Sequence, residues 1–250
     1  MKAWLLEWRI EVLRNVRNRR FFIFTILFPV GFYLLYVNLY GQNAQMAGID
    51  WSKYFLISMS VFGVVGTGLN GTAVRVAIER TQGWTSWMLT TPRSAAQAVT
   101  TKLAANVVLS AMGIAVMFLV GALVEHVQMS AGAWFACGVT TVFGALVFTA
   151  LGILIGHLGG REAAQILASI VYFLVSIAGG LWIPVQILPP FFQHLAQWMP
   201  TYRLADIAWA VIGQRAVPWS DFAVMAAYLV GLVLVSAWVS TRPREVRSVA

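Results

Sequence analysis

Residues 133–156 read AWFACGVTTVFGALVFTALGILIG and carry no charged side chain over 24 positions. A helix of about 20 apolar residues, rising 1.5 Å per residue, crosses the roughly 30 Å hydrocarbon core of a bilayer. Five further uncharged hydrophobic stretches lie at about Phe21–Tyr40, Tyr54–Val74, Leu103–Val124, Ala163–Pro184 and Phe222–Ser240. The sequence therefore predicts an all-α membrane protein with six transmembrane helices in a single domain over residues 21–250.

The composition leads to the same fold class. Hydrophobic residues make up 60% of the 250-residue chain and charged residues only 10%, whereas soluble domains carry about 25% charged residues. The mean hydropathy is +0.77. An ordinary water-soluble domain is excluded because too few charged side chains remain to cover its surface.

The distribution of basic residues predicts the orientation. Cytoplasmic segments of membrane proteins carry an excess of Lys and Arg. If the N-terminus is cytoplasmic, Lys53, Arg203 and Arg215 are the only basic residues outside. The other 14 are then inside: Lys2, Arg9, Arg14, Arg17, Arg19, Arg20, Arg75, Arg80, Arg93, Lys102, Arg161, Arg242, Arg244 and Arg247. We therefore expect both termini in the cytoplasm, and the net charge of +8 requires no nucleic-acid partner.

The N-terminal segment over residues 1–20 has a different pattern. It contains the sequence KAWLLEWRIEVLRNVRNRR, in which Trp4, Trp8, Val12 and Val16 recur every four residues. Such spacing puts the apolar side chains on one face of a helix, while arginines beside them suit anionic headgroups. We expect a cytoplasmic amphipathic helix that lies in the membrane interface and contacts lipids. A simple basic anchor before the first span is the alternative.

Catalytic and nucleotide-binding motifs are missing from the sequence. A P-loop needs a lysine directly after a glycine, and none of Lys2, Lys53 and Lys102 satisfies this. The three histidines lie far apart in different loops, which is unlike a metal site. None of the six predicted spans contains Asp, Glu, Lys or Arg, the residues that usually serve as relays for ion-coupled transport. We expect no enzyme activity, metal or cofactor on this chain.

Glycine spacing indicates close helix contacts. Gly152, Gly156 and Gly160 form two consecutive G-x-x-x-G steps at the end of the fourth span. Small residues at this spacing let two helix backbones approach closely. We expect these glycines to pack against another helix, either within the chain or in a second copy.

The stretch after the second span, residues 77–102, reads AIERTQGWTSWMLTTPRSAAQAVTTK. Apolar side chains at helical spacing, followed by Thr-Thr-Pro, predict a short amphipathic helix in the longest cytoplasmic loop. An interfacial helix without a partner is the alternative to a protein contact. The residues of interest are Glu79, Arg80, Trp84, Trp87, Met88, Leu89 and Pro92.

A second unusual stretch, residues 179–200, reads GGLWIPVQILPPFFQHLAQWMP. Its density of glycine and proline is too high for a straight spanning helix, and it is too apolar for a solvated loop. Short re-entrant or outer helices between the fifth and sixth spans fit best, and a passive external cap is the alternative. The helix-breaking residues are Gly179, Gly180, Pro184, Pro189, Pro190 and Pro200.

Taken in order along the chain, these features resemble the ABC-2 family of permeases, the membrane subunits of many bacterial ABC exporters. The resemblance rests on the basic amphipathic N-terminus, Phe28-Pro29 in the first span, the Glu79-to-Pro92 stretch and the late Gly-Gly…Pro…Pro pattern. After Arg80 the sequence departs from the usual family pattern, because Thr81, Gln82 and Gly83 replace a second acidic residue and Gly-Thr. Within the family, a first span with Phe28-Pro29 and compact loops make the chain look more like the drug- and peptide-exporting members than the polysaccharide or teichoic-acid exporters.

The resemblance implies a division of labour between subunits. Two permeases, either identical or paired with a paralogue, would sit in the cell membrane on two cytoplasmic ATPase subunits that bind ATP and Mg. Trp87 and Leu89 would then seat in a groove of the ATPase, with Glu79 and Arg80 at its rim, and the stretch 179–200 would act as an outer gate. The expected activity is export of an amphiphilic small molecule, antibiotic, peptide or lipid. The alternative is a non-transporting membrane immunity or sensor protein.

Overall fold

The computed structural model describes residues 2–17, 19–40, 44–46, 48–84 and 94–240, and it is almost entirely helical. Two short strands, β1 (Gln45–Met46) and β2 (Ile49–Asp50), form an antiparallel pair. The longer helices are α1 (Lys2–Arg17), α2 (Arg19–Tyr40), α3 (Trp51–Gly66), α4 (Thr72–Thr81), α6 (Ala95–Leu123), α7 (Ala131–Gly156), α8 (Arg161–Ala178), α10 (Pro200–Ile212) and α11 (Trp219–Ser240). Three short helical pieces complete the fold: the π-helix η1 (Thr67–Gly71), the 3-10 helix η2 (Val185–Ile187) and α9 (Pro190–Ala196). The predicted all-α fold class is confirmed.

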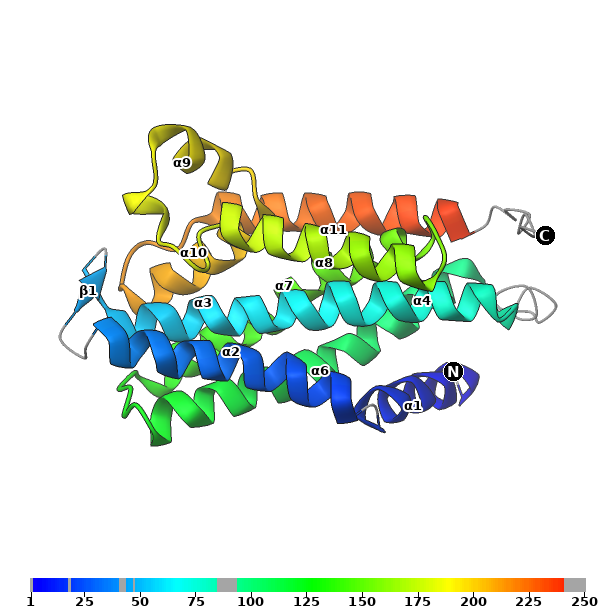
Figure 1. The fold of residues 1–250 in the computed structure, drawn as a ribbon, viewed down its shortest axis with the longest axis horizontal. Coiled ribbons are helices and arrows are strands. Elements are labelled where there is room, and N and C mark those ends of the chain that lie inside the picture. Colours follow the sequence, from blue (N-terminus) through cyan, green and yellow to red (C-terminus); the bar gives the residue numbers. More distant parts are fainter. Residues whose placement is uncertain (1, 18, 41–43, 47, 85–93, 241–250) are drawn as a thin grey trace.

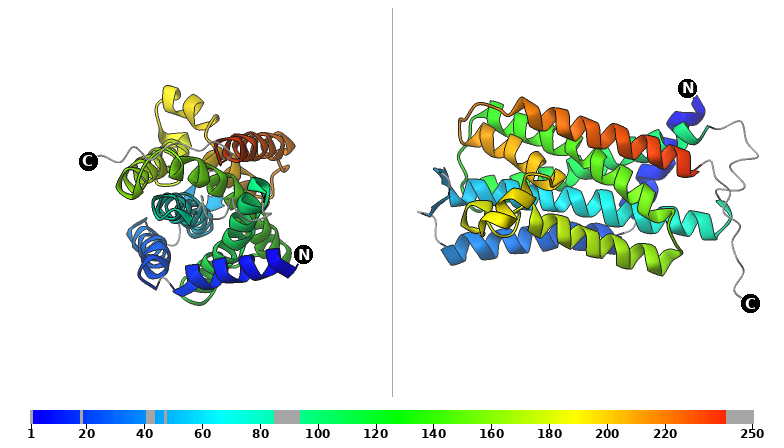
Figure 2. Two further views of the ribbon diagram at one scale, coloured as in Figure 1. Left: turned by 90° about the vertical axis from the view of Figure 1, so that its right-hand side faces the viewer. Right: turned by 90° about the horizontal axis from the view of Figure 1, so that it is seen from above.

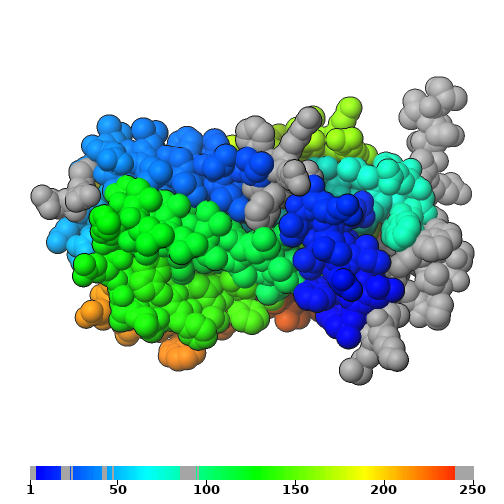
Figure 3. All heavy atoms as spheres, turned by 90° about the horizontal axis from the view of Figure 1, so that it is seen from below, coloured from blue at the N-terminus to red at the C-terminus, as the bar shows by residue number. Residues whose placement is uncertain are grey.

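The long helices run side by side in an elongated bundle (Figure 1). Helix α1 and the ends of α4 and α11 lie at one end of the bundle, and the strand pair and α9 lie at the other. We call these the α1 end and the α9 end. Seen along the long axis, α1 lies lengthwise across the bundle while the long helices point toward the viewer (Figure 2). The space-filling view shows α1 packed beside the α6 and α4 segments (Figure 3).

Within the described residues, five helices are long and apolar enough to cross a membrane: Trp51–Thr81, Ala96–Leu123, Ala131–Gly156, Arg161–Ala178 and Trp219–Val239. Helix α2 contains a shorter apolar stretch, Thr25–Tyr40, which coincides with the remaining predicted span. The chain is therefore a multi-pass membrane protein, and each predicted apolar stretch falls on a helix.

Two helices extend well beyond the predicted spans. The second span was expected to end at Val74, but α3, η1 and α4 form one helical run to Thr81, and the third was expected to start at Leu103, whereas α6 begins at Ala95. Charged residues were taken as loop residues, yet the helices continue through them because those charges have partners elsewhere in the fold. Ser94 and Gln97 form a capping box that starts α6.

Tight backbone contacts join α7 to the η1–α4 segment. A Cβ atom on Gly152 would lie 2.6 Å from the carbonyl oxygen of Gly68, and one on Gly156 would lie 2.7 Å from that of Ala73. Glycine is required at both positions because real Cβ contacts are never so short. Gly160 instead precedes α8, and a Cβ there would meet nothing within 4 Å.

The segment between α8 and α11 contains short helices and one well-buried helix. Helix α8 ends at Ala178, before Gly179 and Gly180, rather than reaching the predicted limit at Pro184. Gly180 has a φ of 74°, which a residue with a side chain rarely adopts. Helix α10 buries Leu204 and Trp209 against the bundle, and the Trp209 ring stacks on Tyr54 of α3 with a centroid distance of 4.5 Å. The segment between α8 and α11 therefore contributes α10 to the core of the bundle.

Candidate functional site

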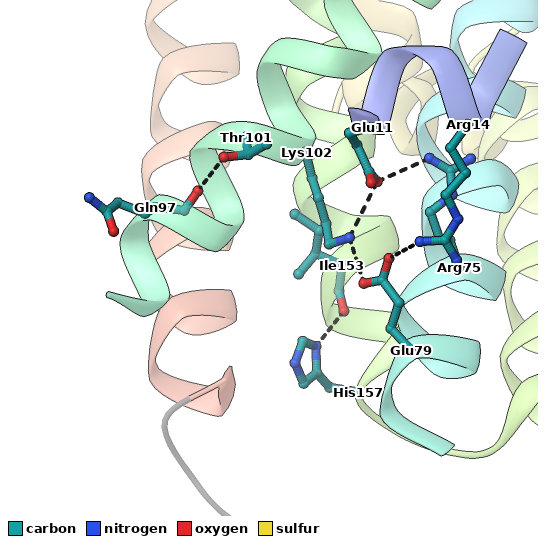
Figure 4. Close-up of polar contacts among 9 residues, drawn as sticks. All are labelled: Glu11, Arg14, Arg75, Glu79, Gln97, Thr101, Lys102, Ile153 and His157. Carbon is teal, nitrogen blue, oxygen red and sulfur yellow. Dashed lines mark hydrogen bonds and ion pairs between the residues drawn. The ribbon is translucent and has the colours of Figure 1, made fainter. Parts of the chain in front are cut away.

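Five charged side chains from three helices meet at the α1 end of the bundle (Figure 4). Glu11 and Arg14 come from α1, Arg75 and Glu79 from α4, and Lys102 from α6. Residues three or four apart share one helix face, so α1 and α4 each present two of these side chains together. We call this group the charged cluster.

The cluster is connected by four ion pairs. Arg75 Nη1 lies 3.1 Å from Glu11 Oε1, and Arg14 Nη1 lies 2.9 Å from Glu79 Oε1. The Lys102 Nζ atom is 2.7 Å from Glu79 Oε2 and 3.4 Å from Glu11 Oε1. Three positive and two negative groups thus interlock, and partners separated by 23 to 91 positions in the sequence are joined.

Most of the cluster is withdrawn from solvent. The side chains of Glu79, Glu11, Arg75 and Lys102 are 9 to 16% exposed, while Arg14 is 45% exposed. Burial by itself raises the pKa of Glu11, but the charges of Lys102 and Arg75 outweigh this effect and hold its pKa below the ordinary value. Glu11 is therefore ionised at neutral pH and keeps its ion pairs.

The end of α7 is tied to the same region through Arg80. Its Nη1 atom donates to the carbonyl oxygens of Gly156 at 3.2 Å and His157 at 2.6 Å. These carbonyls close a helix C-terminus, where a cation is favourable. The His157 Nδ1 atom lies 2.7 Å from the carbonyl oxygen of Ile153, so Nδ1 carries the proton. Burial lowers the pKa of His157 below its ordinary value.

A line of polar side chains leads from the cluster into the bundle. Asn106 Nδ2 donates to Thr149 Oγ1 at 2.7 Å and lies 3.4 Å from Ser110 Oγ. A hollow beside the cluster is lined by Asn15 and Asn106, and Asn15 Oδ1 has no hydrogen-bond partner among the described residues. Buried polar groups are costly unless they are paired. Asn106, Ser110 and Thr149 meet this requirement by pairing with one another.

The predicted contact residues after the second span fall into two groups. Glu79 is 7% exposed and, like Arg80, it has partners within the chain. Trp84 follows the end of α4 and is 47% exposed. Trp87, Met88, Leu89 and Pro92 lie outside the described residues. The proposed contact with an ATPase therefore stays a prediction.

Sequence reasoning missed Glu11, Arg75 and Lys102 as parts of a site. Arg75 and Lys102 were counted only as basic residues that set the orientation. Glu11 was assigned only to the polar side of the N-terminal helix. The available signal was the pairing of opposite charges at helical spacing, Glu11 with Arg14 and Arg75 with Glu79. That signal does not say which helix meets which, because the partners are far apart in the chain.

At the α9 end, the helix-breaking residues turn the chain between α8 and α10. A Cβ on Gly179 would clash with Thr201, whose hydroxyl donates to the carbonyl oxygen of Val175 at 2.5 Å. Pro184 precedes η2, Pro190 begins α9 and Pro200 begins α10. Pro189 lies directly before α9. Large apolar side chains are exposed along this stretch: Ile187, Phe191, Phe192 and Trp198.

The fold and the interlocked helix ends define a helical membrane protein without a metal centre among the described residues, where no group of three His, Cys, Asp or Glu side chains could hold an ion. Residues 45–242 match the family described as ABC-2 family transporter protein, and the chain belongs to that family. It is a permease, as the resemblance implied.

A curated relative covers nearly the same length. The chain is 30% identical over 238 residues to the protein named "Putative transport permease YvfS" of Bacillus subtilis (strain 168). The alignment spans 94% of this chain and 96% of the relative. The shared region therefore includes α4, α6 and the segment between α8 and α11.

Proposed function

We propose that this chain is the transmembrane permease subunit of an ATP-driven exporter. The match of residues 45–242 to the ABC-2 family carries the proposal, and the name of the relative supports a transport role. Hydrolysis would take place on two separate cytoplasmic ABC ATPase subunits, which bind ATP and Mg. This chain would act with a second permease, either a copy of itself or a paralogue.

The proposed topology has six spans, with α2 as the first and both termini in the cytoplasm of the cell. Basic residues gather at the α1 end, where Arg75, Arg80 and Arg161 lie, whereas Lys53, Arg203 and Arg215 are toward the α9 end. The 31 residues of Trp51–Thr81 extend over about 46 Å at 1.5 Å each, more than a 30 Å core. The charged end of α4 can therefore lie beyond the hydrocarbon.

Helix α1 would lie in the cytoplasmic membrane interface as a separate element over residues 1–20. It runs across the bundle end (Figure 2), and Leu6, Ile10 and Leu13 are 48 to 60% exposed on it. An apolar stripe beside arginines suits lipid contact. This stripe differs from the predicted face of Trp4, Trp8, Val12 and Val16, which is half-buried.

The contact with the ATPase would be made by the segment that follows α4. Trp84 at its start is 47% exposed, and α4 is bound through the charged cluster to α1 and α6. Movement of this segment on ATP binding would therefore be passed to three helices. The stretch 179–200 would form the outer gate, where α9 projects from the bundle (Figure 1).

The cargo we propose is an amphiphilic small molecule, antibiotic, peptide or lipid, moved outward. The test uses the tagged full chain with the ATPase that co-purifies from its native membranes, reconstituted into vesicles with ATP outside. Ethidium and a fluorescent NBD-labelled phospholipid serve as probes. ATP-driven, vanadate-sensitive uptake of either probe into vesicles whose ATPase faces outward supports export.

Two results would contradict the proposal. A chain that never captures a P-loop ATPase would favour a non-transporting immunity or sensor protein. An ATPase that is captured and active but moves probes only out of such vesicles would contradict the direction. A vesicle preparation with an ATPase-inactive partner serves as the control for passive leakage.

A further inference from the structure

Lys102 is the one member of the charged cluster that comes from α6, and its ammonium contacts acids on two other helices. We propose that Lys102 is a positioning residue that holds α1 against the ends of α4 and α6, so that the three move as one body during transport. The mechanical part of this inference rests on the proposed function, whereas the docking of α1 can be tested without it.

The contacts show why Lys102 matters more than its neighbours. Arg14 and Arg75 each join α1 to α4 alone, through Glu79 and Glu11. Lys102 reaches both glutamates, at 2.7 and 3.4 Å, and so adds α6 to the pair. Among the ion pairs of the described residues, those of Lys102 are the ones that connect all three helices.

The burial of α1 supports an electrostatic attachment. Within the described part of α1, the residues that are less than a tenth exposed are Glu11 and Asn15, and both are polar. The large apolar side chains Leu6, Ile10 and Leu13 face away from the bundle and are about half exposed. The apolar side chains Trp4, Trp8, Val12 and Val16 are only half-buried. Because the most deeply buried side chains in the described part of α1 are polar, we infer that its position depends strongly on the charges beneath it.

Removing the ammonium would leave two buried carboxylates close to the same point. The side chains of Glu11 and Glu79 alone are 12 and 9% exposed, so water screens their repulsion poorly. Arg14 and Arg75 would still neutralise one carboxylate each, but α6 would no longer supply an ion pair to the cluster. We therefore expect α1 to separate from the α6 end when Lys102 loses its charge.

The docking is tested on the full chain in lipid nanodiscs. Nitroxide labels at Ile10→Cys on α1 and Thr100→Cys on α6, in a Cys137→Ala background, report the distance between the helices by pulsed electron resonance. We expect one narrow distance distribution in the parent, a broad one in Lys102→Met and a narrow one again in Lys102→Arg. The control is Lys53→Met, which removes an ion pair with Asp50 at the α9 end and should leave the distribution narrow.

A narrow distribution in Lys102→Met would overturn the proposal. If that variant fails to fold, Glu11→Gln replaces it, because it removes the acid on α1 that Lys102 and Arg75 share while keeping its size. We expect a broadened distribution there as well, and an unchanged one would also overturn the proposal.

The mechanical role is tested with the co-purified ATPase and the ethidium or NBD-phospholipid probe. We expect Lys102→Met to lower the amount transported per ATP hydrolysed by about tenfold, with recovery in Lys102→Arg. A normal ratio in Lys102→Met would contradict the role in transport. If the parent moves no probe while Lys102→Met still releases α1, the proposed function fails and the docking role of Lys102 stands.

Discussion

Single glycines decide how closely α7 approaches η1 and α4. At Gly152 and Gly156 the atoms in the way are backbone carbonyl oxygens and the Cβ atoms of Thr72 and Val76. These atoms are fixed by the backbone and cannot rotate aside as the end of a flexible side chain can. The approach brings the α7 terminus to the place where Arg80 reaches its carbonyls. The spacing of the two glycines could be read in the sequence, but the helix opposite them could not.

Gly152→Ala is expected to destabilise the protein by about 1–3 kcal/mol, because its Cβ would lie 2.6 Å from the carbonyl oxygen of Gly68. The measurement is the apparent Tm of the purified chain in detergent, which should fall by several degrees. Gly160→Ala is the matched control, since its Cβ would meet nothing within 4 Å. Equal Tm values for the two variants would mean that the contact is not tight.

His157 makes stability depend on pH near neutrality. Burial lowers its pKa in the folded protein, so the unfolded chain, with a pKa of about 6.5, takes up the proton more readily. The stabilisation is therefore fully present above about pH 6.5 and is lost as the pH falls through and below that value. Arg80, Lys102 and Glu79 are the charged groups around it.

We expect the apparent Tm of the parent to fall between pH 7.5 and 5.5, and that of His157→Gln to fall less over the same range. Glu11 also has a lowered pKa, so its loss of stability begins near its unfolded value of about 4.5 and does not overlap. Parallel Tm curves for parent and variant would show that His157 does not titrate in this way.

At the scale of the element, α4 and the segment after it have different tasks. Arg75, Glu79 and Arg80 bind it to α1, α6 and α7, and the following segment carries the aromatic residues proposed to meet the ATPase. Because Glu79 and Arg80 are engaged within the chain, they are better suited to transmit movement than to form the rim of a subunit contact.

Trp87→Asp is expected to abolish or strongly reduce co-purification of the ATPase, since a central aromatic anchor often contributes about 2 kcal/mol or more to binding. The measurement is pull-down of the ATPase with the tagged permease. Trp198→Asp is the control, because Trp198 is 73% exposed near the α9 end. Should Trp87→Asp capture the ATPase as well as the parent does, the contact lies elsewhere.

At the scale of the whole molecule, the two ends of the bundle differ in chemistry. The α1 end carries the interlocked charges, while the α9 end carries exposed aromatic side chains such as Phe191, Trp198 and Trp219. Positive charge favours the cytoplasmic side of a membrane, and aromatic residues gather at the interfaces. The separation supports one orientation of the whole bundle.

In a Cys137→Ala background, Ser130→Cys is expected to react with a membrane-impermeant maleimide added to intact cells. Ser94→Cys is expected to react only after permeabilisation. Both positions are exposed and directly precede long helices, α7 and α6, so accessibility within the protein does not separate them. Labelling in the reverse order would contradict the orientation.

Hydropathy alone determined the helical membrane class and the place of each apolar stretch, because about 20 uncharged residues in a row have no stable position except inside a bilayer or a large core. The sequence also contained the family pattern on which the permease assignment rests, and residues 45–242 match that family. These properties are local or additive along the chain, so no knowledge of contacts was needed.

Only the tertiary structure decided where the helices end and what their charges do. Arg75 and Lys102 looked like loop residues because an unpaired charge is unfavourable in an apolar helix. In the structure both pair with Glu11, which lies 64 and 91 positions away from them in the sequence. Residues 179–200 were expected to form short re-entrant or outer helices, and nothing in the sequence indicated that α10, which begins at Pro200, packs into the bundle against Gly144 of α7. Such pairings depend on which helix faces which, and hydropathy carries no information about that.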